Sequence, residues 1–487
     1  MLILAERDAD RSRTALDFAG VVTARVMTDF ALRRYHEATK HSRESVAAGA
    51  RPLDFSNKPL AFKIYTALDP IVAPPDIAEL CLYSNGVLRW GEARTGQKYG
   101  FRAAPCTGAL YHVELYLATA PRPDLATGLY HYSAHDGALR LIRAGDVRGA
   151  LASATGGFAP VAGAPIVAVL TSTFWRNAWK YRSRAYRHVY WDGGVILANL
   201  LALAAARGTR ASVVMGFADA AVDQLVGADG TREASFALVA LGDGATAAAR
   251  PAALPVLDLE TEPLSSREER YPLIEEAHHA SSLGSGEEAA AWRARADAVS
   301  TSMPAQLTDR PIEEVIRARR STRQFTLRPI TREQLDAALA AAIAPIPGDA
   351  FGAHVVDPFL IVNAVEGLDA GTYRGDLTPI RRGDFRSEAG ELALGQRLGA
   401  DAAANVYWLA DLDAVLARFG ERGYRVAQLA GGMAGGRLEL AATDMRLGAT
   451  GLTFFDDEVT DFFEPVASGR PVTYVAAIGR RARVPRR

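Results

Sequence analysis

An internal repeat is the feature of this sequence that most restricts its fold. Three landmarks recur 238 residues apart: Tyr186-Arg187 with Tyr424-Arg425, Gly193-Gly194 with Gly431-Gly432, and Phe217 with Phe455. In both copies a strand-like run follows and ends in glycine, at Gly242 and at Gly479. Three landmarks in one register are more than Ala/Gly-rich helices share by chance. The chain is therefore predicted to contain a duplicated α+β domain.

The order of elements is expected to be the same in both copies. An arginine-bearing approach leads into a long apolar helix, then a turn, a short acidic helix and a closing strand. The two copies are placed at residues 61–243 and 311–487. Residues 244–310 are rich in proline, serine and charged side chains and are predicted to form a linker, with a helix around Glu287–Val299. Residues 1–60 form an N-terminal leader region to which the sequence assigns no role.

Composition argues against several classes of function. The 55 Lys and Arg residues balance 56 Asp and Glu residues, and a net charge of −1 gives no strong field for nucleic acid or a membrane. Two cysteines, Cys81 and Cys106, are too few for a disulfide framework or a cysteine-rich zinc site, and no bound metal is expected. The start Met1–Asp8 turns charged too soon for a signal peptide, and the apolar run Leu197–Ala206 is too short for a membrane span. A cytoplasmic enzyme is expected.

The second copy opens with a cluster of arginines around a small hydroxyl group. Arg319-Arg320-Ser321-Thr322-Arg323 precedes Pro329-Ile330-Thr331, an ordinary helix start, so the cluster is expected between two helices. Arginine makes bidentate hydrogen bonds to phosphate oxygens, and serine adds a short donor. The cluster is thus suited to bind a phosphate group. A solvated basic face is the alternative, and composition alone favours it.

This cluster resembles the opening of the flavin-dependent nitroreductase superfamily, in which Arg-Arg-Ser-x-Arg-x-Phe is followed by Pro-Ile-Thr and a Leu-bearing helix. In that family the cluster binds the phosphate and ribityl chain of FMN. The resemblance implies two nitroreductase-like domains, each with an antiparallel central sheet flanked by helices, that pair within one chain as a pseudo-dimer. It also implies FMN as the cofactor, bound through Arg319, Arg320, Ser321 and Arg323.

A second signature lies in the first copy. The run from Pro105 to Tyr116 is similar to the Pro-Ser-x-Gly-Ala-x-Tyr-Pro-x-Glu-x-Tyr stretch of the SagB-type branch, the azoline dehydrogenases of thiazole- and oxazole-modified peptides. In that branch the stretch lies against the isoalloxazine ring, where small residues let backbone amides approach closely. Cys106 replaces the usual serine, and His112 the usual proline. The residues that the resemblance places at the ring are Pro105, Cys106, Thr107, Gly108 and Ala109.

The third signature is Lys180-Tyr181, which stands where the same branch carries the lysine–tyrosine pair proposed as its catalytic dyad. Aromatising an azoline removes a hydride, which FMN can accept, and a carbon-bound proton, which needs a positioned base. An ammonium becomes such a base only if burial or nearby cations lower its pKa. We expect Arg182, Arg184 and Arg187 to be those cations, and Tyr181 to relay the proton or orient the substrate. A surface lysine beside a core tyrosine is the alternative.

The two copies carry complementary parts of one site. The first has the ring-facing loop and Lys180-Tyr181 but no Arg-Arg-Ser, whereas the second has the arginines but Arg418-Phe419 in place of the pair. This predicts one composite flavin site and an opposite pseudo-site without flavin. A monomer is conceivable, because the chain contains its own dimer partner, and a homo-oligomer stays open. The remaining expected contacts are Gly448, Thr450 and Gly451 at the polar edge of the flavin, and Arg480 and Arg481 at its phosphate.

Three functions are consistent with the sequence. The leading hypothesis is an FMN-dependent oxidation of thiazolines or oxazolines in a ribosomally made, thiopeptide-like modified precursor peptide, with oxygen as electron acceptor and cyclodehydratase subunits as partners. An NAD(P)H-dependent nitro or quinone reductase is the second, and the Lys-Tyr pair argues against it. A flavin-free scaffold subunit of a peptide-modifying complex is the third. The identity of the peptide does not follow from the sequence.

Overall fold

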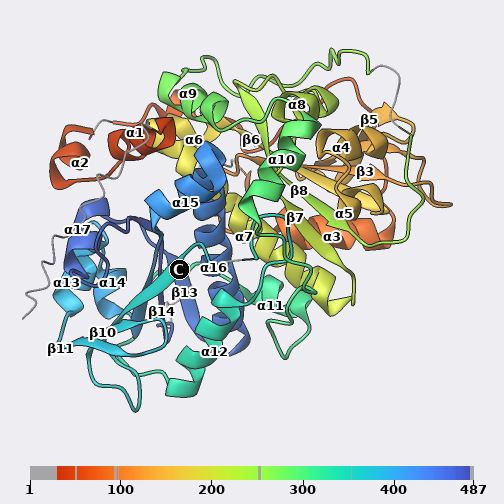
Figure 1. Cartoon of the computed structure of the whole chain (residues 1–487). Helices are drawn as coiled ribbons and strands as arrows, with labels where there is room; N and C mark the ends of the chain where they lie inside the picture. The colour runs from red at the N-terminus through yellow and green to blue at the C-terminus, as the bar shows by residue number, and fades with distance from the viewer. Residues whose placement is uncertain are drawn as a thin grey trace, which may run out of the picture.

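The computed structural model of this chain describes residues 30–49, 52–92, 96, 98–249, 254–352 and 354–482. The start of the chain, on which the expectation about a signal peptide rests, lies outside these ranges. Each half of the described chain contains a six-stranded sheet in which all neighbouring strands are antiparallel, flanked by helices. The predicted fold class, two α+β domains that pair within one chain, is therefore confirmed (Figure 1).

The two sheets have the same strand order. In the first half the order is β5-β4-β3-β6-β8-β7, and in the second it is β11-β10-β9-β12-β14-β13. The first sheet consists of β3 (Val113–Thr119), β4 (Gly128–Ser133), β5 (Ala138–Ala144), β6 (Ile166–Thr173), β7 (Ala211–Val214) and β8 (Glu233–Leu241). The second consists of β9 (Asp357–Val362), β10 (Gly371–Arg374), β11 (Pro379–Arg382), β12 (Ala404–Leu409), β13 (Gly448–Gly451) and β14 (Val472–Gly479). A separate hairpin joins β1 (Val87–Glu92) to β2 (Lys98–Arg102).

The helices repeat in the same way. Those of the first half are α1 (Ala31–Ala38), α2 (Arg43–Gly49), α3 (Pro75–Asn85), α4 (Arg148–Ala154), α5 (Ala159–Ala162), α6 (Phe174–Tyr181), α7 (Ala185–Ala206) and α8 (Asp219–Val226). Those of the second half are α9 (Pro272–Ala280), α10 (Gly286–Ala296), α11 (Ile312–Ala318), α12 (Arg332–Ile343), α13 (Arg386–Leu392), α14 (Arg397–Asp401), α15 (Leu412–Phe419), α16 (Gly423–Asp444) and α17 (Asp456–Phe462). The helix start at Thr331 is as expected, and Gln334 completes a capping box with it.

Helices α7 and α16 cross at the centre of the molecule (Figure 1), and glycine permits the crossing. A Cβ atom on Gly432 would lie 2.6 Å from the carbonyl oxygen of Trp191, and one on Gly194 would lie 2.6 Å from the backbone nitrogen of Met433. The Gly-Gly landmarks of the repeat are thus the points at which one half touches the backbone of the other. They fix the distance between the halves.

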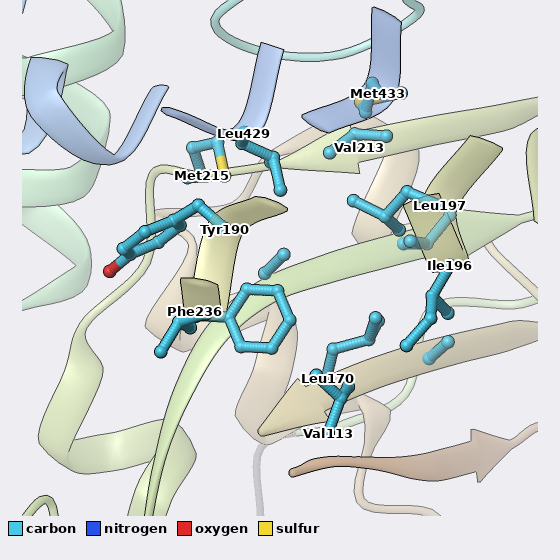
Figure 2. Close-up of a cluster of buried hydrophobic side chains, with 14 of the residues drawn as sticks. Val113, Leu170, Tyr190, Ile196, Leu197, Val213, Met215, Phe236, Leu429 and Met433 are labelled. Atoms are coloured by element: carbon cyan, nitrogen blue, oxygen red, sulfur yellow. The ribbon is translucent and has the colours of Figure 1, made fainter. Parts of the chain in front are cut away.

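Apolar side chains from both halves fill one core around this crossing. Figure 2 shows Leu429 and Met433 of α16 packed among side chains of the first half such as Leu197 and Phe236. The continuous helical stretch Phe174–Ala206 is long and apolar enough to cross a membrane by composition alone, but 89% of its most apolar window is buried inside the protein. It is packed as a core helix, as expected for Leu197–Ala206.

Two matching clusters of buried ion pairs hold the halves together. Asp456, at the start of α17, pairs with Arg184 at 2.8 Å and with Arg187 at 2.5 Å. Asp219, at the start of α8, pairs with Arg422 and Arg425, both at 2.6 Å. In each cluster the carboxylate comes from one half and both guanidinium groups come from the other. The arginines satisfy the carboxylate charge that burial would otherwise disfavour.

The leader region and the linker make equivalent contacts with these two clusters. The backbone nitrogen of His41, after α1, donates to Asp456 at 2.8 Å, and that of Leu283, after α9, donates to Asp219 at 2.8 Å. Arg187 donates to the carbonyl oxygen of His36 in the same way that Arg425 donates to that of His278. The segments at residues 31–41 and 272–283 therefore occupy equivalent positions, and the repeat extends beyond 61–243 and 311–487. We infer that each copy begins at α1 or α9.

Candidate active site between the two halves

The loop that precedes β3 is held by one acidic side chain of α7. Asp192 accepts hydrogen bonds from the backbone nitrogen of Thr107 at 3.0 Å and from its hydroxyl group at 2.8 Å. It also contacts the Sγ atom of Cys106 at 3.0 Å and Nε2 of His112 at 2.9 Å. Burial, and then Asp192, raise the pKa of Cys106 well above its usual range, so the thiol stays protonated and donates to the carboxylate.

The two residues that depart from the SagB-type pattern thus share one partner. Cys106 and His112 both bind Asp192, and Nδ1 of His112 lies 2.8 Å from the hydroxyl oxygen of Ser172. Gly108 has a φ of 66°, a left-handed conformation that glycine adopts without strain. The chain of contacts from Ser172 through His112 to Asp192 fixes the shape of this loop.

The arginine cluster of the second half lies against this loop. Nε of Arg319 donates to the carbonyl oxygen of Ala103 at 3.2 Å, and its Nη1 lies 3.4 Å from Glu439 of α16. Burial raises the pKa of Tyr111 first, and Arg102 and then Arg319 act on it in the opposite direction. Arg319 of the second half thus contacts Ala103, two residues before the ring-facing loop of the first half.

A group of guanidinium groups surrounds Arg320, the next residue. Burial lowers the pKa of Arg320, and repulsion from Arg89, Arg319 and Arg481 lowers it further. Like charges gather in this way at sites that receive an anion, because the anion removes the repulsion. Arg89 comes from β1 of the first half, so both halves contribute to this cationic group. It has the chemistry of a phosphate site.

The turn at the start of β13 forms the floor beneath these arginines. Ser321 pairs with Ala449, and the backbone nitrogen of Thr322 donates to the carbonyl oxygen of Ala449 at 3.1 Å. A Cβ atom on Gly448 would collide with the side chains of Arg481 and Thr322. Gly451, at the other end of the strand, is exposed, and its backbone can be approached from outside. Thr450 is buried.

Two further predicted ligands are Arg480 and Arg323. Nε of Arg480 donates to the carbonyl oxygen of Pro329 at 2.7 Å, which directs its side chain toward the start of α12. Arg323 is exposed. Of the expected phosphate ligands, the fold brings together Arg320, Ser321 and Arg481, and Gly448 of the expected polar edge lies against Arg481.

The Lys180-Tyr181 pair lies on the other side of the ring-facing loop. A Cβ atom on Gly108 would lie 2.9 Å from the hydroxyl oxygen of Tyr181. Burial raises the pKa of Tyr181, and the negative charge of Asp192 acts in the same direction, so the phenol keeps its proton. The Nζ atom of Lys180 lies 5.1 Å from the centre of the Tyr181 ring.

The pKa of Lys180 is lowered, as expected, and burial contributes as expected, but the cation that contributes is not one of the expected arginines. Partial burial lowers it first, and the charge of Lys58 lowers it further. Arg184 and Arg187 are buried and both pair with Asp456, more than 260 residues away in the sequence. Arg182 donates to the carbonyl oxygen of Gly49. Proximity in sequence did not show which cations act on Lys180, because Arg184 and Arg187, at the start of α7, are directed toward the other half.

Three residues of this site were not predicted. Asp192 and Glu439 are buried charged residues within the apolar helices α7 and α16, and that contrast was a readable signal. Arg89 lies on a half-exposed hairpin without any motif, and no signal in the sequence marks it. Glu439 stands opposite Arg319, and burial raises its pKa. The site thus contains an acidic side chain as well as basic ones.

The equivalent place on the opposite side of the molecule is closed. There the loop before β9 pairs directly with β7: the backbone nitrogen of Val213 donates to Pro347 at 2.9 Å, and that of Asp349 donates to Val213 at 3.1 Å. The carboxylate of Asp349 accepts from the backbone nitrogens of Met215 and Gly216, at 2.7 and 2.9 Å. Between the ring-facing loop and β13, the described residues form no such backbone pairs. The two sides of the pseudo-dimer therefore differ. Backbone hydrogen bonds join the two segments on one side, whereas a ring system needs them apart, as on the other side.

A wide cavity of about 670 Å³ lies elsewhere, between α4, α8 and the start of α10. Small residues and backbone line most of it, and Glu287 is the one charged residue among them. It has neither the cations nor the proton-transfer groups described above. The chemistry of the chain is concentrated between the loop before β3 and β13.

Comparisons with known proteins agree with this architecture. The sequence profile described as the nitroreductase family matches residues 85–243 and 316–480. A nitroreductase-like protein from Anabaena variabilis ATCC 29413 is 27% identical, with a TM-score of 0.76, and the match covers 93% of this chain and 100% of that one. No curated protein matches the chain.

Two further solved structures share less. A chain of the E. coli microcin synthetase McbBCD complex with truncated pro-MccB17 is 21% identical, with a TM-score of 0.31, over 42% of this chain and 73% of that one. A nitroreductase-like protein from Ralstonia eutropha JMP134 is 20% identical, with a TM-score of 0.29, over 40% and 88%. The family profile covers both halves, and one solved structure matches along its full length. This protein belongs to the nitroreductase family.

Proposed function

We propose that the protein is an FMN-dependent dehydrogenase that oxidises thiazoline or oxazoline rings of a ribosomally made, modified peptide to thiazoles or oxazoles. One observation carries the proposal: a lysine with a lowered pKa and a protonated tyrosine lie together beside the ring-facing loop. Reduction of an external acceptor needs no base that removes a proton from carbon, whereas aromatisation does. The pair supports the second reaction.

The composite site fits FMN. The group formed by Arg89, Arg320 and Arg481 suits the phosphate, since it gathers cations whose mutual repulsion an anion would relieve. Thr322 has a buried hydroxyl oxygen without a hydrogen-bond partner among the described residues, which leaves it available to a ligand. The Pro105–Ala109 loop on one side and exposed Gly451 on the other would hold the ring system, with small residues that permit close approach.

The reaction divides between cofactor and protein. Bound FMN would supply the acceptor for a hydride, and oxygen would take up the electron pair. Neutral Lys180 would take the proton from the other ring carbon, so that the azoline loses one hydride and one proton and gains a double bond. Protonated Tyr181 would orient the substrate through its hydroxyl group. A lowered pKa makes more of Lys180 neutral at a given pH, which is the form that acts as a base.

The peptide would have to reach an open face of the molecule. Lys180 is exposed, so a bulky substrate can approach it without prior opening of the fold. A modified precursor peptide, delivered by cyclodehydratase subunits that form the azolines, is the partner that this chemistry requires. Such subunits would install the rings that this protein oxidises.

Mass spectrometry of a thiazoline-bearing peptide incubated in air with the flavin-loaded protein tests the proposal. Each converted ring is expected to lose about two mass units, because one hydrogen pair leaves. Lys180→Ala should reduce turnover at least about a hundredfold, the usual contribution of a general base, while the protein stays yellow. Lys98→Ala, which removes another exposed lysine, is the matched control and should turn over normally.

Three results would contradict the proposal. Unchanged turnover in Lys180→Ala removes the lysine from the mechanism. Rapid bleaching of the flavin by NADPH under anaerobic conditions, without any azole product, assigns the site to a nitro or quinone reductase. A colourless protein that does not bind added FMN would instead support the scaffold.

A further inference from the structure

Lysine is rare in this protein, so the positions at which it occurs are informative. The chain has five lysines among its 55 basic residues, so the other fifty are arginines. Lys40 pairs with Glu37 and Asp457, and Lys63 is buried in a pair with Glu233. Arginine serves as well as lysine wherever a permanent positive charge is needed, but its guanidinium does not release a proton in proteins. A lysine without an acidic partner therefore stands out in a chain that otherwise uses arginine.

Two of these lysines belong to elements that pack on each other. The turn at residues 54–58 contains a short helix, Phe55–Asn57, and lies on the end of α6. The indole nitrogen of Trp179 donates to the carbonyl oxygen of Asp54 at 3.2 Å, and the rings of Phe55 and Trp179 meet edge to face at 5.6 Å. Lys58 ends this turn, and Lys180 follows Trp179. Within the described chain neither lysine forms an ion pair.

We infer that Lys58, on the turn packed against α6, acts together with partial burial to favour the neutral amine of Lys180; the two lysines are called the lysine pair below. Lys58 acts through Lys180 and is therefore a positioning residue. The pKa of Lys180 is lowered by partial burial and then by Lys58, which agrees with the placement of the turn. Repulsion between two ammonium groups is relieved when one of them loses its proton.

The other groups around Lys180 do not replace Lys58 in this role. The ring of Tyr181 favours the ammonium form through its π face, and so works against the lowering. The carboxylate of Asp54 accepts from the backbone nitrogen and the hydroxyl group of Ser56, which turns it toward the turn itself. The guanidinium of Arg182 is held by the carbonyl oxygen of Gly49. Lys58 is the neighbouring cation that acts on the amine.

The inference rests on the proposed function for its purpose, but not for its test. A substrate that covers Lys180 would remove water from the lysine pair, which strengthens the repulsion between the two charges. The effect of Lys58 would then be greatest when the ring to be deprotonated is in place. An arginine at position 180 could not work in this way, because it would stay charged.

The pKa of Lys180 can be measured without any turnover. Reductive methylation with ¹³C-formaldehyde gives each of the five lysines of the full-length, flavin-loaded protein its own NMR signal and keeps the amine titratable. Lys180→Arg identifies the signal. In Lys58→Gln the pKa of Lys180 is expected to rise by about half to one unit, the size of effect that one nearby charge produces. Lys58→Arg should restore the low value, and Lys98→Gln, which removes one charge elsewhere, should not change it.

The pH dependence of kcat provides the functional counterpart. In Lys58→Gln the acid limb is expected to move to higher pH by the same interval, which corresponds to a roughly three- to tenfold loss on that limb and recovery at high pH. An unmoved pKa in Lys58→Gln overturns the inference, whatever the activity. A raised pKa in a protein that oxidises no azoline keeps the lysine pair and contradicts the proposed reaction instead.

Discussion

At the scale of single residues, the site depends on charges placed inside apolar helices. Asp192 binds the ring-facing loop through Cys106, Thr107 and His112, and no motif of the sequence marks it as a ligand. The arginine cluster around Ser321 could be predicted because its residues are adjacent in the chain. The charge of Asp192 within an apolar helix was visible, but its role was not, because its partners lie 80 or more residues earlier and meet it only in the folded protein.

Asp192→Asn is expected to weaken FMN binding about tenfold or more. The amide keeps the shape of the side chain but loses the charge that Thr107 and His112 bind, and hydrogen bonds to charged groups contribute about 1.5–3 kcal/mol each. Titration with FMN, followed by flavin fluorescence, measures the change. Cys106→Ser should bind FMN as the natural protein does, because the serine hydroxyl can donate to Asp192. Equal affinity in Asp192→Asn would show that the loop needs no such support.

At the scale of elements, the crossing of α7 and α16 sets the width of the site. The glycine pairs of the repeat were visible in the sequence, but their partners were not, because periodicity does not say which helix lies opposite. The same limit explains the leader and the linker. Their equivalence shows in contacts, such as those of His36 and His278, while their sequences share few residues.

Gly432→Val is expected to destabilise the protein by about 1–3 kcal/mol, the usual cost of overpacking, and to weaken flavin binding with it. A side chain there meets the backbone of Trp191, so the helices must separate, and Asp192 moves away from the second half. Urea unfolding and FMN titration measure the two effects. Gly163→Ala is the matched control, since a Cβ atom there meets nothing closer than 3.5 Å. A native-like Gly432→Val protein would contradict the role of the crossing.

At the scale of the whole molecule, the buried ion clusters make the union of the halves sensitive to acid. The arginines Arg422 and Arg425 oppose the effect of burial and hold the pKa of Asp219 at about 2, below the unfolded value of about 3.9. A lowered pKa means that Asp219 stabilises the fold fully above about pH 4 and loses this contribution as the pH falls toward 2. The arrangement around Asp456 adds to the same trend, because its pKa is also lowered.

The urea concentration at the midpoint of unfolding should therefore decrease as the pH is lowered from 4 to 2. About 2 kcal/mol of the loss in unfolding free energy should be due to Asp219. In Asp219→Asn the protein should be about 3–5 kcal/mol less stable at pH 7, because two buried guanidinium groups lose their partner. The loss below pH 4 should be smaller in this variant than in the natural protein. A variant with an unchanged acid slope would exclude Asp219 from the pH dependence.

The duplication could be predicted from the sequence because its landmarks keep one register, and a single site remains a proposal that rests on each copy lacking what the other carries. The closed side could not be predicted, since no sequence pattern indicates that the backbone nitrogen of Met215 donates to the carboxylate of Asp349. The asymmetry of the molecule is thus built into its loops, while the two sheets remain alike.

The number of FMN molecules bound per chain tests the central claim most directly. Titration of the purified protein, followed by flavin fluorescence, should saturate at one FMN per chain of 52.1 kDa. Arg320→Glu in the second half should abolish this binding, because it places a negative charge among Arg89, Arg319 and Arg481. Saturation at two FMN per chain, or undiminished binding by Arg320→Glu, would contradict a single site shared by the two halves.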